Sequence, residues 1–191
     1  MVDTKQTSVY NAGVPELKLL YTRHDIEVRI KQLASRISDD YNGRSPLVIG
    51  VLKGAVIFLA DLVREIELPL EIDFIGMSSY GSDTTTCGQA VVTSNPTAAL
   101  DGRDIIIVED IVDTGICLKA LREYLASRHP ASVRVCALLD KPSRRRVPVA
   151  VDYAGFEIPD KFVVGYGLDC AQRYRNLPAI YTLEDNDVRE Y

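Results

Sequence analysis

The sequence predicts an α/β domain, a doubly wound parallel sheet flanked by helices, and two observations support this prediction. First, Leu47–Leu52 and Ile105–Val108 are runs of aliphatic residues without polar alternation, the pattern of strands that are buried on both faces. Second, each run is followed by a short turn containing glycine and then by apolar residues spaced three and four apart, as in a helix. Strands that alternate with helices in this way form parallel βαβ units.

Length, charge and cysteine content exclude several classes of protein. The chain has 191 residues, enough for one domain with a large core. Its net charge of −5 argues against general nucleic-acid binding. No apolar stretch approaches the roughly 18 residues of a membrane span, and the N-terminus lacks the apolar segment of a secretory signal. The cysteines form no C-x-x-C pair, which is typical of free thiols in a reducing compartment, so we expect a cytoplasmic protein.

The first helix is predicted from its cap. Thr22 followed by Asp25 has the pattern of a capping box, and apolar residues at helical spacing continue from there to Asn42-Gly43. Residues 1–16 are polar and show no periodicity, so we expect a loose arm or an edge segment before the helix.

A hairpin with a long loop is predicted next. Alternating apolar and acidic residues over 70–74 predict a strand whose acidic face is exposed to solvent. Small polar residues fill 78–89, and residues 90–93 would be the returning strand. Loops of this length inside a compact domain are usually functional, so we expect a mobile lid.

The remainder of the chain continues the alternation of helices and strands. A helix marked by Leu118, Leu121 and Leu125 follows the central strand. Four further strands are expected after it: 132–139, 149–153, 162–167 and 179–183. We interpret Arg144-Arg145-Arg146 as a solvated loop.

The polar residues after Ile105–Val108 indicate a ligand site. Glu109 and Asp110 come first, and Asp113-Thr114-Gly115 precede the next helix. Ligands of parallel sheets bind at the carboxyl ends of the strands, and a turn of small residues before a helix offers free N–H groups to a phosphate. Because carboxylates repel phosphate, the two acids are better suited to ribose hydroxyls and to Mg²⁺, which prefers oxygen ligands. The pattern therefore favours a phosphorylated ribose bound with Mg²⁺.

Taken alone, these residues also fit other interpretations. The acids could be solvated groups that cap the next helix. A phospho-receiver domain also has an acid pair after a buried strand, but near the start of its chain rather than at 109–110. Lys53-Gly54, after the other buried strand, suits a second anion, although a solvated lysine in a glycine turn explains it equally well. The nucleotide-binding patterns G-x-G-x-x-G and G-x-x-x-x-G-K-[ST] are absent.

Several segments, in this order, carry a family resemblance. They are Leu52–Gly54, Ser79-Tyr80, Val108–Gly115, Leu139–Lys141 and Pro159–Asp169, with Arg175 beyond. On these segments the chain resembles the hypoxanthine-guanine phosphoribosyltransferases from about Ile26 to Leu183. The resemblance implies the type I phosphoribosyltransferase fold, with a long flexible hairpin loop. It also implies a single domain over 1–191, with a core at about 40–165 and a hood from about 1–25 and 166–191.

The resemblance also implies a reaction of purine salvage. A 6-oxopurine base, hypoxanthine or guanine, would attack C1 of 5-phosphoribosyl-1-pyrophosphate (PRPP), giving IMP or GMP and pyrophosphate, with Mg²⁺ as cofactor. Asp113 would be the catalytic base that accepts the proton of purine N7, and Glu109 and Asp110 would hold the ribose hydroxyls and a metal ion. The other residues expected to bind PRPP or its phosphates are Lys53, Gly54, Ser79, Tyr80, Thr114, Gly115, Ile116, Cys117 and Arg175. In this family a cis peptide precedes the lysine.

The purine subsite is implied by the later segments. Lys141 would reach purine O6, Phe162 would stack on the base, and the backbone of Val163 would bind its edge. Asp169 would lie at the same subsite and serve a second Mg²⁺. Ser79 and Tyr80 would close over the bound substrates.

This chain departs from the family pattern at two cysteines. Cys117, preceded by Ile116, stands where the family commonly has a hydroxyl residue in the phosphate loop, and a thiol is a weaker donor than a hydroxyl. Cys170 stands where an aromatic residue usually follows the metal-binding aspartate. Neither change removes a charge that the reaction needs.

Two other functions fit parts of this pattern. One is a phosphoribosyltransferase that prefers xanthine. The other is a regulator that keeps the PRPP site and binds nucleic acid, against which Lys141 and the acidic net charge argue. The family implies a homodimer or a homotetramer that acts on small molecules, without a nucleic-acid or membrane partner.

Overall fold

The computed structural model describes residues 17–79 and 90–184. The predicted arm at 1–16 and residues 80–89 of the predicted lid, including Tyr80, lie outside these ranges. In chain order the elements are β1 Lys18–Tyr21, α1 Arg23–Asp40, β2 Leu47–Leu52, α2 Val56–Glu65, β3 Glu71–Ser79, β4 Ala90–Ser94, β5 Asp104–Val112, α3 Ile116–Ala126, β6 Ser132–Asp140, the 3₁₀ helix η1 Pro142–Arg144, β7 Tyr153–Glu157, β8 Phe162–Val164 and β9 Ile180–Leu183.

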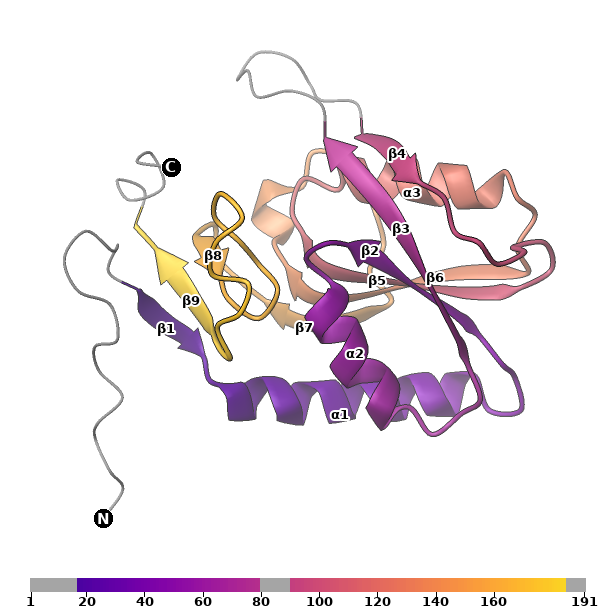
Figure 1. Cartoon of the computed structure of the whole chain (residues 1–191), viewed down its shortest axis with the longest axis horizontal. Coiled ribbons are helices and arrows are strands. Elements are labelled where there is room, and N and C mark those ends of the chain that lie inside the picture. Colours follow the sequence, from indigo (N-terminus) through magenta and orange to yellow (C-terminus); the bar gives the residue numbers. More distant parts are fainter. Residues whose placement is uncertain (1–16, 80–89, 185–191) are drawn as a thin grey trace.

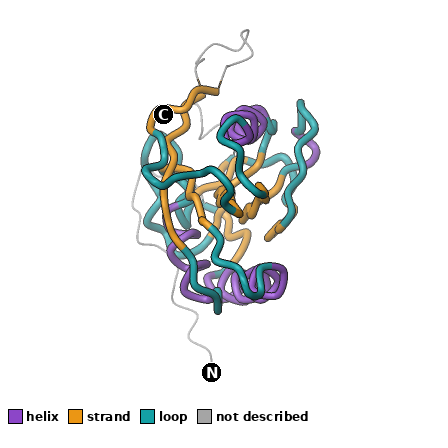
Figure 2. Tube along the Cα trace, turned by 90° about the vertical axis from the view of Figure 1, so that its right-hand side faces the viewer, coloured by secondary structure: helices purple, strands orange, loops and turns teal. Residues whose placement is uncertain are grey.

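A mostly parallel sheet forms the centre of the molecule. Its strand order is β4-β3-β2-β5-β6-β7, and all neighbours pair in parallel except β3 and β4, which form the predicted antiparallel hairpin at one edge. In the side view of Figure 2, strands lie between helices on opposite sides of the sheet. The predicted doubly wound α/β fold is therefore confirmed.

The central strand is buried on both faces, as its aliphatic run predicts. Ile106 and Val108 of β5 belong to the core cluster formed with α1 and α2, whereas Ile105 and Ile107 belong to the cluster formed with α3. All four side chains are fully buried. Because successive residues of a strand point to opposite faces, only a continuous apolar run can fill two cores at once.

Helix α1 begins where its cap predicts. The Thr22 side chain accepts a hydrogen bond from the Asp25 N–H, and the Asp25 carboxylate accepts one from the Thr22 N–H. This reciprocal pair satisfies two donors that have no partner within the helix. Ile26, Ile30 and further apolar residues at the same spacing then face the sheet.

A smaller antiparallel sheet lies beside the central one. Its order is β1-β9-β8, so it joins residues from both ends of the described chain. Val164 and Leu183 of this sheet pack with Cys170 in a separate apolar cluster. Strand β1 was not predicted, and the strand predicted at 162–167 ends earlier, at Val164.

Two local predictions are wrong. The strand predicted at 149–153 is found at Tyr153–Glu157, where Gly155 allows the backbone of Leu138 to approach so closely that a Cβ would overlap its carbonyl. On β3 the apolar face is exposed as well, because Ile72 is 48% and Phe74 38% exposed, whereas on the acidic face only Glu71 is exposed. Asp73 is half-buried and accepts hydrogen bonds from the N–H groups of residues 97 and 98.

None of the helices in the described ranges combines the length and the apolar character needed to cross a membrane.

Candidate active site

In the acid pair of the central strand, Glu109 is buried and Asp110 is half-buried. Glu109 and Asp110 lie near the carboxyl end of β5, and Glu109 is only 7% exposed. Burial raises the pKa of Asp110 to about 6, although a hydrogen bond from the Ile111 N–H acts to lower it. Burial, and then the charge of Asp110, raise the pKa of Glu109 well above its ordinary value. Two adjacent buried carboxylates are unfavourable unless a cation or hydroxyl donors bind them, so the pair suits a ribose diol and a metal ion.

Gly54 lies between the acid pair and the segment that follows β8. A Cβ on Gly54 would overlap the carboxylate of Asp110, and a Cβ on Gly167 would overlap the carbonyl oxygen of Gly54. Gly167 has a φ of +100°, a conformation that only glycine adopts without strain. The peptide bond between Leu52 and Lys53 is cis, as the family resemblance implies. Lys53 itself is exposed.

The turn between β5 and α3 has the shape of a phosphate site. Gly115 is the N-cap of α3, has a φ of +82° and, as a glycine, offers no side chain to cap the helix. The Thr114 hydroxyl accepts a hydrogen bond from the Ile116 N–H over 3.4 Å. Cys117 follows in the first turn of α3, and burial and the charge of Glu109 raise the pKa of its thiol. A helix N-terminus with free N–H groups favours an anion.

One oxygen of the Asp113 carboxylate accepts no hydrogen bond from the described residues. This Oδ1 atom is buried, and the Arg144 Nε atom lies 3.1 Å away from it. The guanidinium is thus close enough for an ion pair, but its N–H is not aligned for a hydrogen bond. Arg144 also pairs with Asp160 over 3.1 Å. Asp113 can therefore accept a proton from a ligand without first losing a hydrogen bond at Oδ1.

The predicted purine residues meet at the end of β6. Lys141 is only 6% exposed, and its Nζ atom donates to the carbonyl of Lys161 over 2.6 Å. Burial lowers the pKa of Lys141, whereas the charge of Asp113 acts to raise it. Phe162 follows Lys161 at the start of β8 and is half-buried, and Val163 beside it is buried. The ammonium group, the aromatic ring and the predicted base therefore belong to one region.

Asp169 and Arg175 form an ion pair, with Arg175 Nη2 2.7 Å from Asp169 Oδ1. Arg175 Nη1 also donates to the carbonyl of Gly167 over 2.7 Å, which fixes the guanidinium beside the glycine that packs on Gly54. Both charges act on Asp110: Arg175 lowers the pKa of that carboxyl and Asp169 raises it. This segment therefore lies within electrostatic reach of the acid pair.

The structure thus brings most of the predicted residues to the carboxyl ends of β2, β5 and β6. Ser79 is the last residue of β3, and Tyr80 lies outside the described ranges, so their predicted role stays a prediction. Within the described part of the chain, no group of three or more His, Cys, Asp or Glu side chains is arranged to hold a metal ion alone. Mg²⁺ commonly takes one or two carboxylates and completes its shell with phosphates and water, so Glu109 and Asp110 fit this ion.

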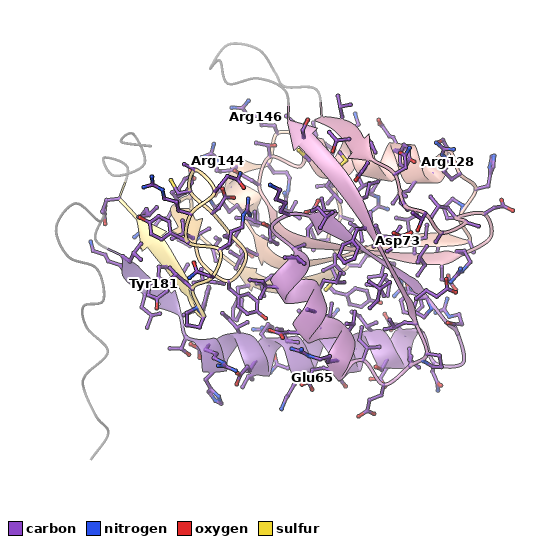
Figure 3. All side chains as sticks on the ribbon, in the orientation of Figure 1. Glu65, Asp73, Arg128, Arg144, Arg146 and Tyr181 are labelled. Carbon is purple, nitrogen blue, oxygen red and sulfur yellow. The ribbon has the colours of Figure 1, made fainter. Side chains whose placement is uncertain are left out.

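The interpretation of the arginine run as a solvated loop is wrong for Arg145, whereas Arg144 and Arg146 are exposed. The Arg145 side chain is only 15% exposed, pairs with Asp140 and donates to the carbonyl of Asp113. Arg144 reaches Asp113 as described above, and in Figure 3 Arg144 and Arg146 are labelled on the same side of the molecule. A run of like charges ordinarily indicates a solvated loop, and the contacts with Asp113 and Asp140 change that interpretation for Arg145.

Comparison with known families agrees with this geometry. Residues 17–171 match the family described as phosphoribosyl transferase domain. Because this match covers most of the chain, the chain belongs to the phosphoribosyltransferase family.

Within this family the chain is similar to particular enzymes. It is 45% identical over 167 residues to the hypoxanthine-guanine phosphoribosyltransferase of Bacillus subtilis. This alignment covers 87% of this chain and 93% of the relative. It is 47% identical over 162 residues to the hypoxanthine phosphoribosyltransferase of Haemophilus influenzae, and this alignment covers 83% of this chain and 90% of the relative. A crystal structure of a Bacillus anthracis hypoxanthine-guanine phosphoribosyltransferase superposes with a TM-score of 0.85 at 42% identity, covering 88% of this chain and 100% of the other.

Proposed function

We propose that this chain transfers the 5-phosphoribosyl group of PRPP to hypoxanthine or guanine, giving IMP or GMP and pyrophosphate. The observation that carries the proposal is the buried ammonium of Lys141, which lies near Asp113 at the end of the strand next to the acid pair. Similarity to enzymes with this activity over most of the chain supports the same reaction.

The proposed chemistry divides among the described groups. Purine N9 forms a bond to C1 of the ribose while the bond from C1 to pyrophosphate breaks, and the leaving group takes the electron pair. Asp113 takes the N7 proton on its carboxylate, whose Oδ1 atom accepts no hydrogen bond from the described residues. The N–H groups of the 113–117 turn hold the 5-phosphate, and Arg175, Lys53 and the backbone at Gly54 hold pyrophosphate. Positively charged side chains and backbone N–H donors both stabilise the negative charge that develops on a leaving group.

Mg²⁺ is proposed to bind at the acid pair. Glu109 and Asp110 would hold it together with the ribose hydroxyls, and Asp169 would serve a second ion. When bound, Mg²⁺ would neutralise phosphate charge. The elevated pKa of both buried acids is the observation that favours a cation here, because a nearby positive charge would relieve the cost of ionising them.

The base specificity is proposed from hydrogen bonding. Phe162 would stack on the purine, the Val163 backbone would bind its edge, and Lys141 would donate to O6. These groups serve hypoxanthine, guanine and xanthine alike at O6, so a preference for xanthine is the second candidate.

We also propose a homodimer or homotetramer in the cytoplasm. Large apolar side chains are exposed on β3 and around the start of α2: Leu52, Val56, Ile72 and Phe74. Large apolar surfaces that a single chain leaves exposed commonly mark contacts between proteins. The solved relative from Trypanosoma cruzi has been studied for the role of its C-terminal region in oligomeric state and enzymatic activity. Light scattering on wild type and on Phe74→Glu would test whether this surface joins two copies.

The decisive experiment is a turnover assay with PRPP, Mg²⁺ and each of hypoxanthine, guanine and xanthine. We expect IMP and GMP to form with hypoxanthine and guanine. Preferential use of xanthine would support the second candidate, and binding of PRPP without turnover of any base would refute both enzyme assignments.

A further inference from the structure

Arg145 links the turn that carries the proposed base, Asp113, to Asp140 at the end of β6, and we call this pair of contacts the clamp. The Arg145 guanidinium donates from Nη1 to the main-chain carbonyl of Asp113 over 2.7 Å, and its Nη2 pairs with the Asp140 carboxylate. The side chains of Arg145 and Asp140 are only 15% and 16% exposed, so this ion pair is largely shielded from solvent. One planar cation therefore joins the turn after β5 to the last residue of β6.

The backbone next to Arg145 continues the clamp. The N–H groups of Arg146 and Val147 both donate to the carbonyl of Thr114, over 3.0 and 3.3 Å. Two successive carbonyls of the turn, those of Asp113 and Thr114, are thus held by one short segment. The turn lies close against that segment, because a Cβ on Gly115 would lie 2.9 Å from the carbonyl oxygen of Val147.

The position of the clamp relates it to both substrates. Asp113 would accept the purine proton, and Thr114 and Gly115 belong to the turn that would hold the 5-phosphate. Asp140 directly precedes Lys141, whose ammonium would bind purine O6. The Arg145 guanidinium therefore fixes the distance between the group that would bind the purine and the turn that would bind the ribose phosphate.

The geometry points to Arg145 as a positioning residue for phosphoribosyl transfer. Its guanidinium is bound to the Asp113 carbonyl and to Asp140, and through these two contacts it would hold Asp113 and Lys141 at a fixed distance from each other. This inference rests on the proposed function, since it concerns the same site. Reacting groups must be held closely, and a displacement of about 1 Å by a remote change can cost roughly 100-fold in rate.

The Arg145→Lys substitution separates positioning from stability. A lysine keeps the positive charge beside Asp140, but its single ammonium cannot reproduce the two-pronged geometry that joins that carboxylate to the Asp113 carbonyl. For Arg145→Lys we expect the rate of IMP formation in a single turnover to fall by about 10- to 100-fold. Thermal unfolding should show a folded protein at the assay temperature.

Arg146→Ala is the matched control. Arg146 belongs to the same run and its side chain is exposed, with no side-chain ion pair among the described contacts, while its main-chain N–H to Thr114 is unaffected by the substitution. We expect this variant to react at the wild-type rate. Arg145→Met, which removes the charge, should lose at least as much rate as Arg145→Lys and also lose thermal stability.

The outcomes distinguish this inference from the proposed function. If wild type forms no nucleotide from any 6-oxopurine, the proposed function fails. If wild type is active and folded Arg145→Lys matches it in single-turnover rate, the positioning role is overturned and Arg145 is only a structural ion pair. A loss of rate in Arg146→Ala equal to that in Arg145→Lys would likewise overturn it.

Discussion

The carboxylate of Asp110 lies directly against Gly54, so that a Cβ on the glycine would overlap the Oδ2 atom. The end of β2 and the acid pair of β5 can approach this closely only because the glycine has no side chain. The acid that is proposed to bind ribose and Mg²⁺ is thereby fixed against the backbone that is proposed to bind pyrophosphate.

Gly54→Ala should therefore displace Asp110 and reduce activity. We expect kcat/KM with PRPP to fall by roughly 100-fold, the cost of misplacing a binding group by about 1 Å. The control is Gly43→Ala, at a glycine with a φ of +75° and no atom within 4 Å of its Cβ position. That variant should lose some thermal stability through backbone strain and keep its activity. Equal activity of wild type and Gly54→Ala would show that Asp110 has no such role.

The pKa of Asp110 leads to a prediction about stability. Because burial raises that pKa to about 6 in the folded protein, from an ordinary value of 3.8, the folded state binds more protons than the unfolded state between these values. The free energy of unfolding of the ligand-free protein should therefore fall as the pH rises from about 4 to about 6, because the folded state must give up the proton that it binds more tightly. Above pH 6 the ionised, buried carboxylate is a constant penalty.

Asp110→Asn removes this penalty. At pH 7.5 the ligand-free variant should exceed wild type in free energy of unfolding by on the order of 1–3 kcal/mol, and the difference should shrink towards pH 4. Urea unfolding at several pH values is the measurement. Asp101→Asn, at an exposed turn residue, should show no such pH-dependent gain. A difference that grows as the pH falls would contradict the assigned burial of Asp110.

Local patterns allowed much of the fold to be predicted. The aliphatic run at Ile105–Val108 determines a strand with two buried faces, and the Thr22–Asp25 pair determines the start of α1, because each depends on residues close in sequence. The family pattern placed Gly54, the acid pair and Lys141 at neighbouring strand ends. Their individual roles, and the division into a core and a hood, stay predictions.

Contacts between distant segments could not be predicted in this way. How far each face of β3 is covered depends on distant elements, so the alternation over 70–74 did not predict that Ile72 and Phe74 are exposed. Arg145 lies in a run of three arginines, and its partners at Asp113 and Asp140 become evident only when β5 and β6 are placed side by side. Gly155 weakened the strand signal of β7, although close approach to Leu138 is the reason for a glycine there.

Asp113→Asn tests the proposed base. The substitution preserves shape but removes a proton acceptor, so kcat should fall by roughly 10²- to 10⁴-fold, the range for a lost general base, while the affinity for PRPP changes little. Asp160→Asn is the control, because Asp160 is the other carboxylate that pairs with Arg144. Steady-state kinetics and calorimetric titration with PRPP would measure both quantities. A kcat for Asp113→Asn close to that of wild type would exclude the assigned role.

Cys117 tests the phosphate turn. Since burial and the charge of Glu109 raise the pKa of the thiol, it stays neutral and is a weak donor in the first turn of α3. Cys117→Thr adds a hydroxyl donor, so the KM for PRPP should fall. Cys117→Val has nearly the shape of threonine without the hydroxyl, and it should not lower the KM. If valine and threonine act alike, the side chain at 117 does not face the phosphate.

The choice of base should depend on Lys141. An ammonium has three donors and no acceptor, so it can donate to purine O6 but opposes the 6-amino group of adenine. The group is 6% exposed and held by the Lys161 carbonyl, so water cannot easily relieve the mismatch. A buried donor left unpaired costs about 1–3 kcal/mol, and sites built on one hydrogen bond can reject the wrong analogue by about 10⁴-fold.

Wild type should therefore use hypoxanthine and guanine but not adenine, whereas Lys141→Gln should narrow the difference, because an amide can either donate or accept. Lys141→Met is the control, since it keeps a long side chain but offers neither group; it should lose activity with hypoxanthine without gaining any with adenine. The measurement is kcat/KM for hypoxanthine and adenine in all three proteins. The argument fails if wild type uses adenine within about tenfold of hypoxanthine, a preference below what one lost buried hydrogen bond should produce. It fails equally if Lys141→Gln leaves the ratio unchanged, because the ammonium would then not be the group that distinguishes the two bases.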